Sequence, residues 1–190
     1  MHNRFPPIIL ASKSPRRQEL LKLLGIDFRI VLKEVDESYP EGLSPAEIAT
    51  YISEKKAKAF DELVNDEVVI TADTIVVIDG RILGKPENDD DAFKILSTLS
   101  GRMHEVITAV SLVKNGQIRS FCEVSEVYFR EISAEQIQYY IKNGNPSDKA
   151  GAYGIQEWIG LIAIERINGS YTNVVGLPTH RLYQELCTFI

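Results

Sequence analysis

The sequence has only two cysteines and no long run of apolar residues. Cys122 and Cys187 are far apart and lack the close spacing of a zinc site or a redox disulfide, so we expect neither, and we expect two buried thiols. No segment approaches the ~20 apolar residues that a membrane span needs. Residues 1–7 contain no apolar core of signal-peptide length. These absences predict a cytoplasmic protein with no membrane partner.

Positive charge is also scarce. The chain has 21 lysines and arginines against 27 aspartates and glutamates, which gives a formal net charge of -6. Binding along a nucleic-acid backbone requires a basic face, so we expect no nucleic-acid partner. A small phosphorylated ligand needs only a local group of cations and stays compatible with this balance.

The chain does contain enough apolar sequence for a core. Of its 190 residues, 44% are hydrophobic and 25% are charged, which is typical of a globular protein. We expect a single domain over residues 1–190, as one body or as two lobes that share a sheet. Predicted strands and helices alternate through the first half of the chain and a hairpin follows, which favours an α/β fold with a mixed sheet.

An apolar, partly β-branched stretch at residues 8–11 leads into Ser12-Lys13-Ser14-Pro15-Arg16-Arg17. This pattern predicts a short strand that runs into a helix capped by Ser14, continuing over residues 18–24 and ending at Gly25. Helix N-termini and paired arginines attract anions. The turn is therefore a candidate phosphate site, and a capped helix with surface cations is the alternative.

Residues 68–78 are nearly continuously apolar or β-branched, as expected for a central strand covered on both faces. Asp73 lies in the middle of this stretch. A buried carboxylate is costly unless it is paired, so we expect a metal, a cation or several N–H donors beside it and interpret Asp73 as functional. Asp79-Gly80 predicts a hairpin turn. Lys85, in the loop that follows, is a candidate second cation for a phosphate.

The motif Ser44-Pro45-Ala46-Glu47 predicts a helix with a capping box that continues to about Leu63. Lys56 falls on the same face of this helix as Ile48 and Ile52. Such a lysine usually extends to water, which is the alternative to a role in a site. We expect the acidic segment at residues 34–37 to be a solvated loop.

The second half of the chain predicts further elements. Turn signals and periodicity indicate a helix opened by residues 87–91 and ending near 99, a hairpin of strands 105–114 and 118–129, a capped helix from Ser133, a strand at 161–164, an extended piece at 173–178 and a helix at 179–186. We expect His104 to be a hydrogen-bonded structural residue that precedes the hairpin. Small residues at 148–156 allow close approach of a ligand or tight packing.

Several short motifs, each present once, follow one another along the chain: Ser12-x-Ser14-Pro15-Arg16-Arg17, Lys56-Ala57-x-Ala59, Ala72-Asp73-Thr74, Gly84-Lys85-Pro86, Ser100-Gly101 with His104, residues 148–156, and Asn168-Gly169-Ser170 with Val175-Gly176-Leu177-Pro178. Together they closely resemble the Maf family of nucleoside triphosphate pyrophosphatases, once described as septum-formation inhibitors. The resemblance covers nearly the whole chain. It implies an α/β fold like that of the inosine triphosphate pyrophosphatases, with two lobes around a cleft, usually as a homodimer.

The resemblance also implies a reaction and its residues. A nucleoside triphosphate would be hydrolysed to the monophosphate and pyrophosphate with a divalent metal such as Mg²⁺, Mn²⁺ or Co²⁺. Asp73 matches the catalytic carboxylate, and Glu37 and Asp73 match the metal ligands. The residues that match the phosphate cleft are Ser12, Arg16, Arg17, Lys56 and Lys85.

Substrate choice within the family is implied by three positions. Arg17, Thr74 and Gln156 match the subgroup that acts on dTTP and UTP. Modified pyrimidine nucleotides are further candidate substrates. The subgroup that acts on 7-methyl-GTP differs around Thr74 and Gln156 and is the alternative. A nucleotide-binding regulator of cell division without turnover is a further alternative. Two departures stand out: Lys55 adjoins Lys56, and Trp158 replaces a small residue near the expected base pocket.

The residue types suit this chemistry. Phosphoanhydride hydrolysis requires charge neutralisation, alignment and an activated water. Cations would hold the phosphate chain, and carboxylates would hold a hard metal through oxygen. Gln156 offers a donor and an acceptor that match the edge of a pyrimidine ring.

Overall fold

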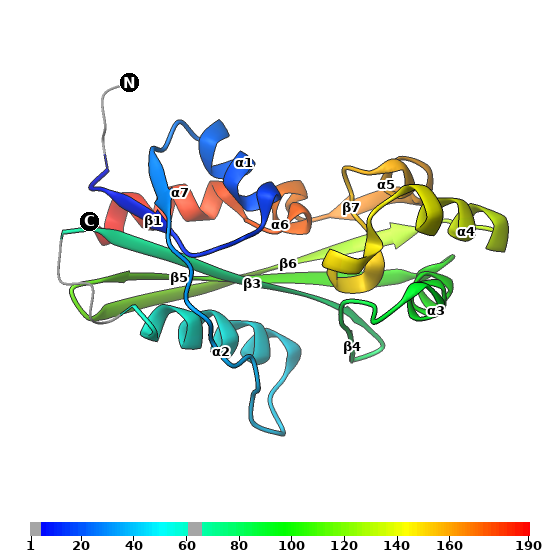
Figure 1. Cartoon of the computed structure of the whole chain (residues 1–190), viewed down its shortest axis with the longest axis horizontal. Helices are drawn as coiled ribbons and strands as arrows, with labels where there is room; N and C mark the ends of the chain where they lie inside the picture. The colour runs from blue at the N-terminus through cyan, green and yellow to red at the C-terminus, as the bar shows by residue number, and fades with distance from the viewer. Residues whose placement is uncertain (1–4, 61–65) are drawn as a thin grey trace. The chain divides into compact units, whose positions relative to one another are not determined.

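A computed structural model describes residues 5–60 and 66–190 of the chain (Figure 1). Its contacts define two compact units. The first unit comprises Met1–Asp73, Thr108–Glu123 and Gly176–Ile190, and the second comprises Thr74–Ile107 and Val124–Val175. The described residues form one seven-stranded sheet in the order β2-β1-β3-β5-β6-β7, with β4 paired to β3. The predicted mixed α/β sheet is therefore confirmed.

The first unit is built on a parallel core of strands. β1 (Ile8–Leu10) pairs in parallel with β2 (Phe28–Ile30) on one side and with β3 (Val68–Ile78) on the other. All three residues of β1 are buried, as a strand covered on both faces requires. β3 has the bounds predicted for it, so Asp73 lies at its centre.

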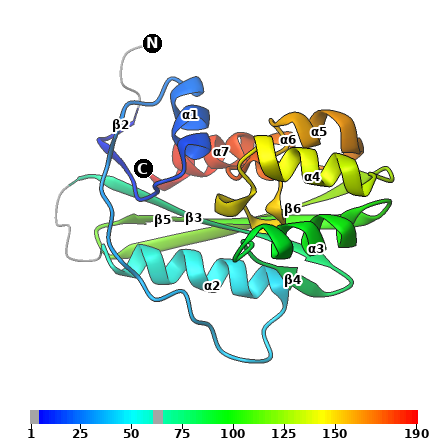
Figure 2. The same cartoon turned by 45° about the vertical axis from the view of Figure 1, so that its right-hand side comes forward.

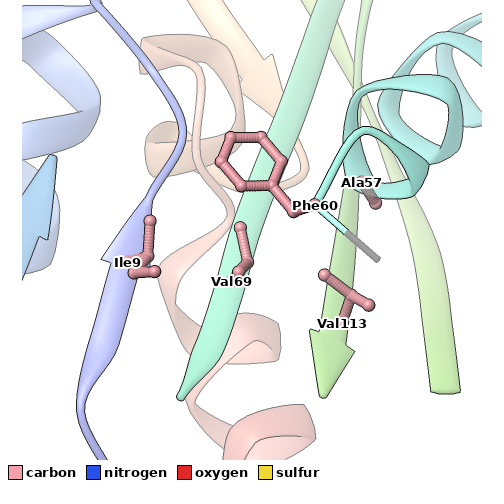
Figure 3. Close-up of a cluster of buried hydrophobic side chains, with 5 residues drawn as sticks. All are labelled: Ile9, Ala57, Phe60, Val69 and Val113. Atoms are coloured by element: carbon pink, nitrogen blue, oxygen red, sulfur yellow. The ribbon is translucent and has the colours of Figure 1, made fainter. Parts of the chain in front are cut away.

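Helices cover both faces of the sheet in the first unit. α2 (Pro45–Lys58) lies on one face, while α1 (Pro15–Leu23) and α7 (Thr179–Phe189) lie on the other (Figures 1 and 2). Beneath the end of α2, buried side chains from three strands and the helix end meet (Figure 3): Ile9, Ala57, Phe60, Val69 and Val113. This packing fixes α2 against β3, which is the contact that builds the site described below.

The second unit begins at Thr74 within β3, which turns back into β4 (Arg81–Leu83) through Asp79-Gly80, both at positive φ. α3 (Asp89–Leu99) packs on α4 (Ala134–Asn143), which contacts α5 (Trp158–Ala163). The remaining elements of this unit are the 3-10 turns Pro146–Asp148 and Ala150–Ala152, β7 (Ile164–Asn168) and α6 (Tyr171–Val175). β7 pairs in antiparallel register with β6 (Gln117–Phe129), and β5 (Met103–Lys114) precedes β6 along the chain.

Two predicted elements of the second unit are wrong. Residues 161–164, expected as a strand, form the end of α5 and the first residue of β7. A short apolar run does not distinguish a strand from a helix by periodicity. Residues 173–178, expected as extended, begin within α6. The side chain of Asn173 is buried there and donates to Val106 O at 3.0 Å and to Ser125 Oγ at 2.9 Å, which holds this short helix in place.

Smaller differences concern element ends and the thiols. α2 ends at Lys58, and the predicted end at Leu63 lies outside the described residues. β5 begins at Met103, so His104 lies within the strand rather than before it. Both cysteines are free, but Cys187 is exposed and Cys122 half-buried, so the expectation of two buried thiols is wrong. Within the described ranges, no helix is long and apolar enough to cross a membrane.

Candidate active site

The turn between β1 and α1 has the predicted strand-to-helix geometry. Ser14 is the N-cap of α1, and its Oγ accepts the backbone N–H of Arg17 at 3.5 Å. Pro15 occupies the first helical position, where its missing N–H costs no hydrogen bond. The buried Ser12 accepts the N–H of Ser14 through its hydroxyl oxygen at 3.2 Å. The turn is therefore fixed by two serine hydroxyls.

Arg17 reaches from α1 to two other parts of the first unit. Its Nε donates to Gly176 O at 2.8 Å and its Nη1 to Ala72 O at 2.8 Å and to Ser12 Oγ at 3.4 Å. Burial, the largest effect, lowers the pKa of Arg17, and the nearby charge of Asp73 raises it. An arginine stays protonated under such shifts. Because Ala72 directly precedes Asp73, Arg17 anchors the backbone of the candidate catalytic residue.

Lys56 joins the two carboxylates that the sequence motifs single out. Its Nζ lies 2.8 Å from Asp73 Oδ1 and 2.8 Å from Glu37 Oε1. The two oxygens are therefore no further apart than twice that distance. The exposed fractions of the side chains are 19% for Lys56, 13% for Asp73 and 57% for Glu37, so solvent reaches this group. Of the three kinds of partner expected for Asp73, a metal, a cation or several N–H donors, the structure shows a cation, and it is Lys56.

The register between α2 and β3 explains why Lys56 faces Asp73. Ser53 precedes Lys56 by three residues on α2 and Thr71 precedes Asp73 by two on β3, so each pair shares a face of its element. Thr71 Oγ1 donates to Ser53 O at 2.7 Å, and Ser53 Oγ lies 2.8 Å from Ser111 Oγ. These buried hydroxyls fix α2 on β3 three residues before Lys56 and two residues before Asp73.

The adjacent lysine has a different partner. Lys55 Nζ lies 2.9 Å from Asp36 Oδ2 and 3.1 Å from Ser38 O. The hydroxyl of Ser38, followed by Lys55, holds the pKa of Asp36 far below its usual range. The acidic segment, expected as a solvated loop, is exposed but bound to α2 by both lysines. Of the two neighbouring lysines, Lys56 is the one that contacts Asp73.

The other predicted site residues occupy separate places. Arg16 is half-buried in the first turn of α1. Thr74, Lys85 and Gln156 belong to the second unit: Thr74 is half-buried in β3, Lys85 is exposed after β4, and Gln156 is exposed in the turn before α5. The structure joins Ser12 with Arg17 and Lys56 with Glu37 and Asp73, and the charges of Asp73, Arg16 and Glu37 all act on Arg17.

The carboxylates suit a metal that a phosphate ligand helps to hold. Among the residues that the structure describes, no group of three or more His, Cys, Asp or Glu side chains is arranged to hold a metal ion. Mg²⁺ is commonly bound by one or two carboxylates and completes its shell with water and substrate phosphates. Glu37 and Asp73, which share one lysine, fit that donor set.

The second unit contains polar groups that the sequence analysis missed. Lys149 is buried and paired with Asp148 and Glu157, and Glu157 also accepts from Tyr140. A lysine and a glutamate that flank a run of glycines and alanines were the available signal. His104 Nε2 lies 2.8 Å from Tyr153 Oη, and burial lowers the pKa of His104 to about 4. Its predicted structural role is confirmed.

Fold and geometry together define an α/β protein with a lysine-bridged carboxylate pair beside an arginine-rich helix N-terminus. The model of the Maf-like protein family matches residues 7–189. The chain therefore belongs to the Maf-like protein family, as its motifs indicated.

Named relatives are similar to the chain over nearly its whole length. A protein of Phocaeicola vulgatus is 54% identical over 181 residues, covering 94% of each chain, and is named a dTTP/UTP pyrophosphatase. A protein of Flavobacterium johnsoniae with the same name is 49% identical over 184 residues, covering 96% of this chain and 95% of its own. The solved Ham1 protein of Staphylococcus aureus is 19% identical with a TM-score of 0.49, covering 95% of this chain and 100% of its own. The low sequence identity and TM-score to the Ham1 protein give no information about the activity of this chain.

Proposed function

We propose that this chain hydrolyses dTTP and UTP to the nucleoside monophosphate and pyrophosphate. The observation that carries the proposal is the contact of Lys56 with both Asp73 and Glu37 at 2.8 Å, beside the capped N-terminus of α1. The names of relatives at about 50% identity support the same activity and the same pyrimidine substrates.

Asp73 is assigned to the water that attacks the triphosphate. A free aspartate with a pKa of about 3.9 is a weak base at neutral pH, so orientation of the water matters as much as acceptance of its proton. The ammonium group of Lys56 contacts Asp73 and adds positive charge against the phosphate chain. A divalent metal (Mg²⁺, Mn²⁺ or Co²⁺) held by Glu37 and Asp73 would neutralise charge that develops on the phosphate oxygens.

The residues around the N-terminus of α1 divide into two roles. Ser12 and Arg16 are assigned to the phosphate chain, because they surround the N-terminus of α1, where backbone N–H groups favour anions. Arg17 donates to Ala72 O, Gly176 O and Ser12 Oγ. We therefore assign Arg17 first to the placement of Asp73 and Ser12, and through them to the phosphate and to substrate choice.

Residues of the second unit complete the proposal. Gln156 and Thr74 are assigned to recognition of the pyrimidine base, and Lys85 to a phosphate, on the resemblance of their motifs to those of the family. The homodimer and the single domain over residues 1–190 also stay predictions from that resemblance.

The test is pyrophosphate release from a panel of nucleoside triphosphates. The panel contains dTTP, UTP, CTP, GTP, 7-methyl-GTP and modified pyrimidine triphosphates, each with Mg²⁺, Mn²⁺ or Co²⁺ and with a chelator as control. We expect metal-dependent release that favours dTTP and UTP. Preference for 7-methyl-GTP would contradict the substrate assignment. Tight UTP binding without pyrophosphate release under any metal would instead indicate a nucleotide-binding regulator.

A further inference from the structure

The most buried charged side chain of the described residues, Lys149, lies in the second unit. Its side chain is 4% exposed. The ammonium nitrogen lies 2.6 Å from Asp148 Oδ1 and 2.8 Å from Glu157 Oε1, and it also donates to Asn145 O. An ammonium group has three N–H donors, and three acceptors surround this one. Such a group is stable inside a protein only while its partners remain.

Glu157 uses its second carboxylate oxygen for another buried group. Its Oε2 accepts the hydroxyl of Tyr140, a side chain that is 1% exposed. The same hydroxyl oxygen accepts the N–H of Gly154 at 3.3 Å. Burial, followed by the hydrogen bond to Glu157, raises the pKa of Tyr140 far above its usual range, so the hydroxyl stays a donor. Lys149, Glu157 and Tyr140 therefore form one connected group, which we call the Lys149 cluster.

The position of Glu157 in the chain shows what the Lys149 cluster holds. Glu157 is the N-cap residue of α5, yet its side chain makes no cap hydrogen bond. An acidic or hydroxyl side chain at an N-cap ordinarily accepts the free N–H groups of the first turn. Here the carboxylate turns to Lys149 and Tyr140 instead. The backbone immediately after Gln156 is thereby fixed to the interior of the unit.

The backbone before Gln156 is packed as closely. A Cβ atom on Gly154 would lie 2.9 Å from Lys149 Cε and 3.0 Å from Glu157 Cδ, and one on Gly160 would lie 2.2 Å from Ile155 O. Both glycines therefore allow contacts that any other residue would displace. The side chain of Gln156 itself is exposed. A rigid backbone that presents a single exposed amide suits a group that must read a ligand at fixed geometry.

We infer that the Lys149 cluster is a positioning device that holds the Gln156 turn and so sets the selectivity of the protein for the pyrimidine base. The inference rests on the proposed function, because it assigns Gln156 to the base. UTP and CTP differ where a carbonyl oxygen is replaced by an amino group, so an amide held in place distinguishes them by matched donors and acceptors. A backbone that moves lets the amide meet either base in more than one position, so the matched contact is less favoured over the mismatched one.

The experiment compares UTP with CTP in variants of the Lys149 cluster. Lys149→Met, Glu157→Gln and Tyr140→Phe are measured for kcat/KM and, with chelator present to prevent turnover, for equilibrium binding of each nucleotide. Tyr140→Phe removes one oxygen atom and keeps the ring, so it disturbs the fold least and decides the test for any charge variant that does not fold. The matched control is Lys142→Met, an exposed lysine of α4 in the same unit.

We expect each cluster variant to lower the UTP-to-CTP ratio by at least about fivefold, and Lys142→Met to leave it unchanged. Gln156→Ala should lower the ratio as much, and Tyr140→Phe added to Gln156→Ala should lower it no further. Folded cluster variants that keep the wild-type ratio in both assays would overturn the inference. A wild-type protein that releases no pyrophosphate contradicts the proposed function, and the binding ratio then decides the inference alone.

Discussion

Each unit has a lysine between two carboxylates, and the two lysines differ in how far water reaches them. Lys56 of the first unit is 19% exposed and pairs with Asp73 and with Glu37, which is 57% exposed. Lys149 of the second unit is 4% exposed and pairs with Asp148, which is 44% exposed, and with Glu157, which is 30% exposed and accepts from Tyr140. The lysine is therefore partly solvated in the first unit and buried in the second.

This difference in exposure indicates in which group a ligand can replace a partner of the lysine. In the first unit, a phosphate or a metal reaches the carboxylates and the lysine from solvent, so the contacts of Lys56 suit a site that changes during a reaction. In the second unit, exchange would leave a charge buried without a partner, which is strongly unfavourable. We interpret the first lysine as a reacting-site cation and the second as a fixed support.

The largest expected effect follows from removing the charge of Asp73 alone. Asp73→Asn is nearly isosteric, so the fold should remain, but the side chain no longer accepts a proton from water. We expect pyrophosphate release from UTP to fall by about a thousandfold. Circular dichroism and thermal unfolding check that the fold is intact. A folded Asp73→Asn protein with wild-type turnover would remove Asp73 from the mechanism.

Replacing the two lysines should separate stability from activity. Lys149→Met removes a buried ammonium group that three acceptors hold and leaves the half-buried Glu157 without its cation, so urea unfolding should show a loss of about 2 kcal/mol or more. Lys56→Met removes a partly exposed cation whose partner Glu37 lies largely in solvent, so we expect a stability loss of about 1 kcal/mol or less, together with about a hundredfold loss of turnover. Equal stability losses for the two variants would contradict the distinction between the lysines.

The closed interior of the second unit should also make stability depend on pH. Burial lowers the pKa of His104 to about 4, so the folded protein keeps the ring neutral. The unfolded chain binds a proton below about pH 6.5, so this stability is present above that pH and is lost as the pH falls toward 4.

At pH 5 the loss from His104 should be about 2 kcal/mol relative to pH 7. Urea unfolding at both values measures it, with His104→Gln as the variant that removes the titrating ring. The variant should show a smaller difference between the two pH values than wild type does. An unchanged difference would assign the pH dependence to other groups.

The smallest expected effect concerns the anchor of the first unit. Arg17→Lys keeps a positive charge but not the planar fork that reaches Ala72 O and Gly176 O together. If Arg17 acts by placing Asp73, kcat should fall about tenfold while KM for UTP changes little. A rise in KM with unchanged kcat would show instead that Arg17 binds the substrate directly.

The first unit was largely predictable because its signals are local. The cap at Ser14, the capping box at Ser44 and the apolar run of β3 each follow from neighbouring residues, and all three are confirmed. The partner of Asp73 was expected as a type but not as a residue, because its identity depends on the register of α2 against β3. The hydrogen bond from Arg17 to Gly176 O joins residues 159 positions apart, so no local sequence pattern predicts it.

The second unit was less predictable because its elements and contacts depend on packing between residues that are not neighbours in the sequence. The apolar residues 161–164 suit a strand or a helix equally, and packing decided for α5. Lys149 and Glu157 flank a run of small residues whose tight turns bring the two side chains together. Nothing in their spacing distinguishes a buried lysine paired with a half-buried glutamate from two solvated surface charges.

The most direct test of the account is to identify the products of UTP hydrolysis by phosphorus-31 NMR, with wild type and Asp73→Asn compared in the presence of a divalent metal. We predict UMP and pyrophosphate in equal amounts from wild type and nearly intact UTP with the variant. Formation of UDP and orthophosphate, or equal turnover by the two proteins, would contradict the assignment of the lysine-bridged carboxylates as a pyrophosphatase site.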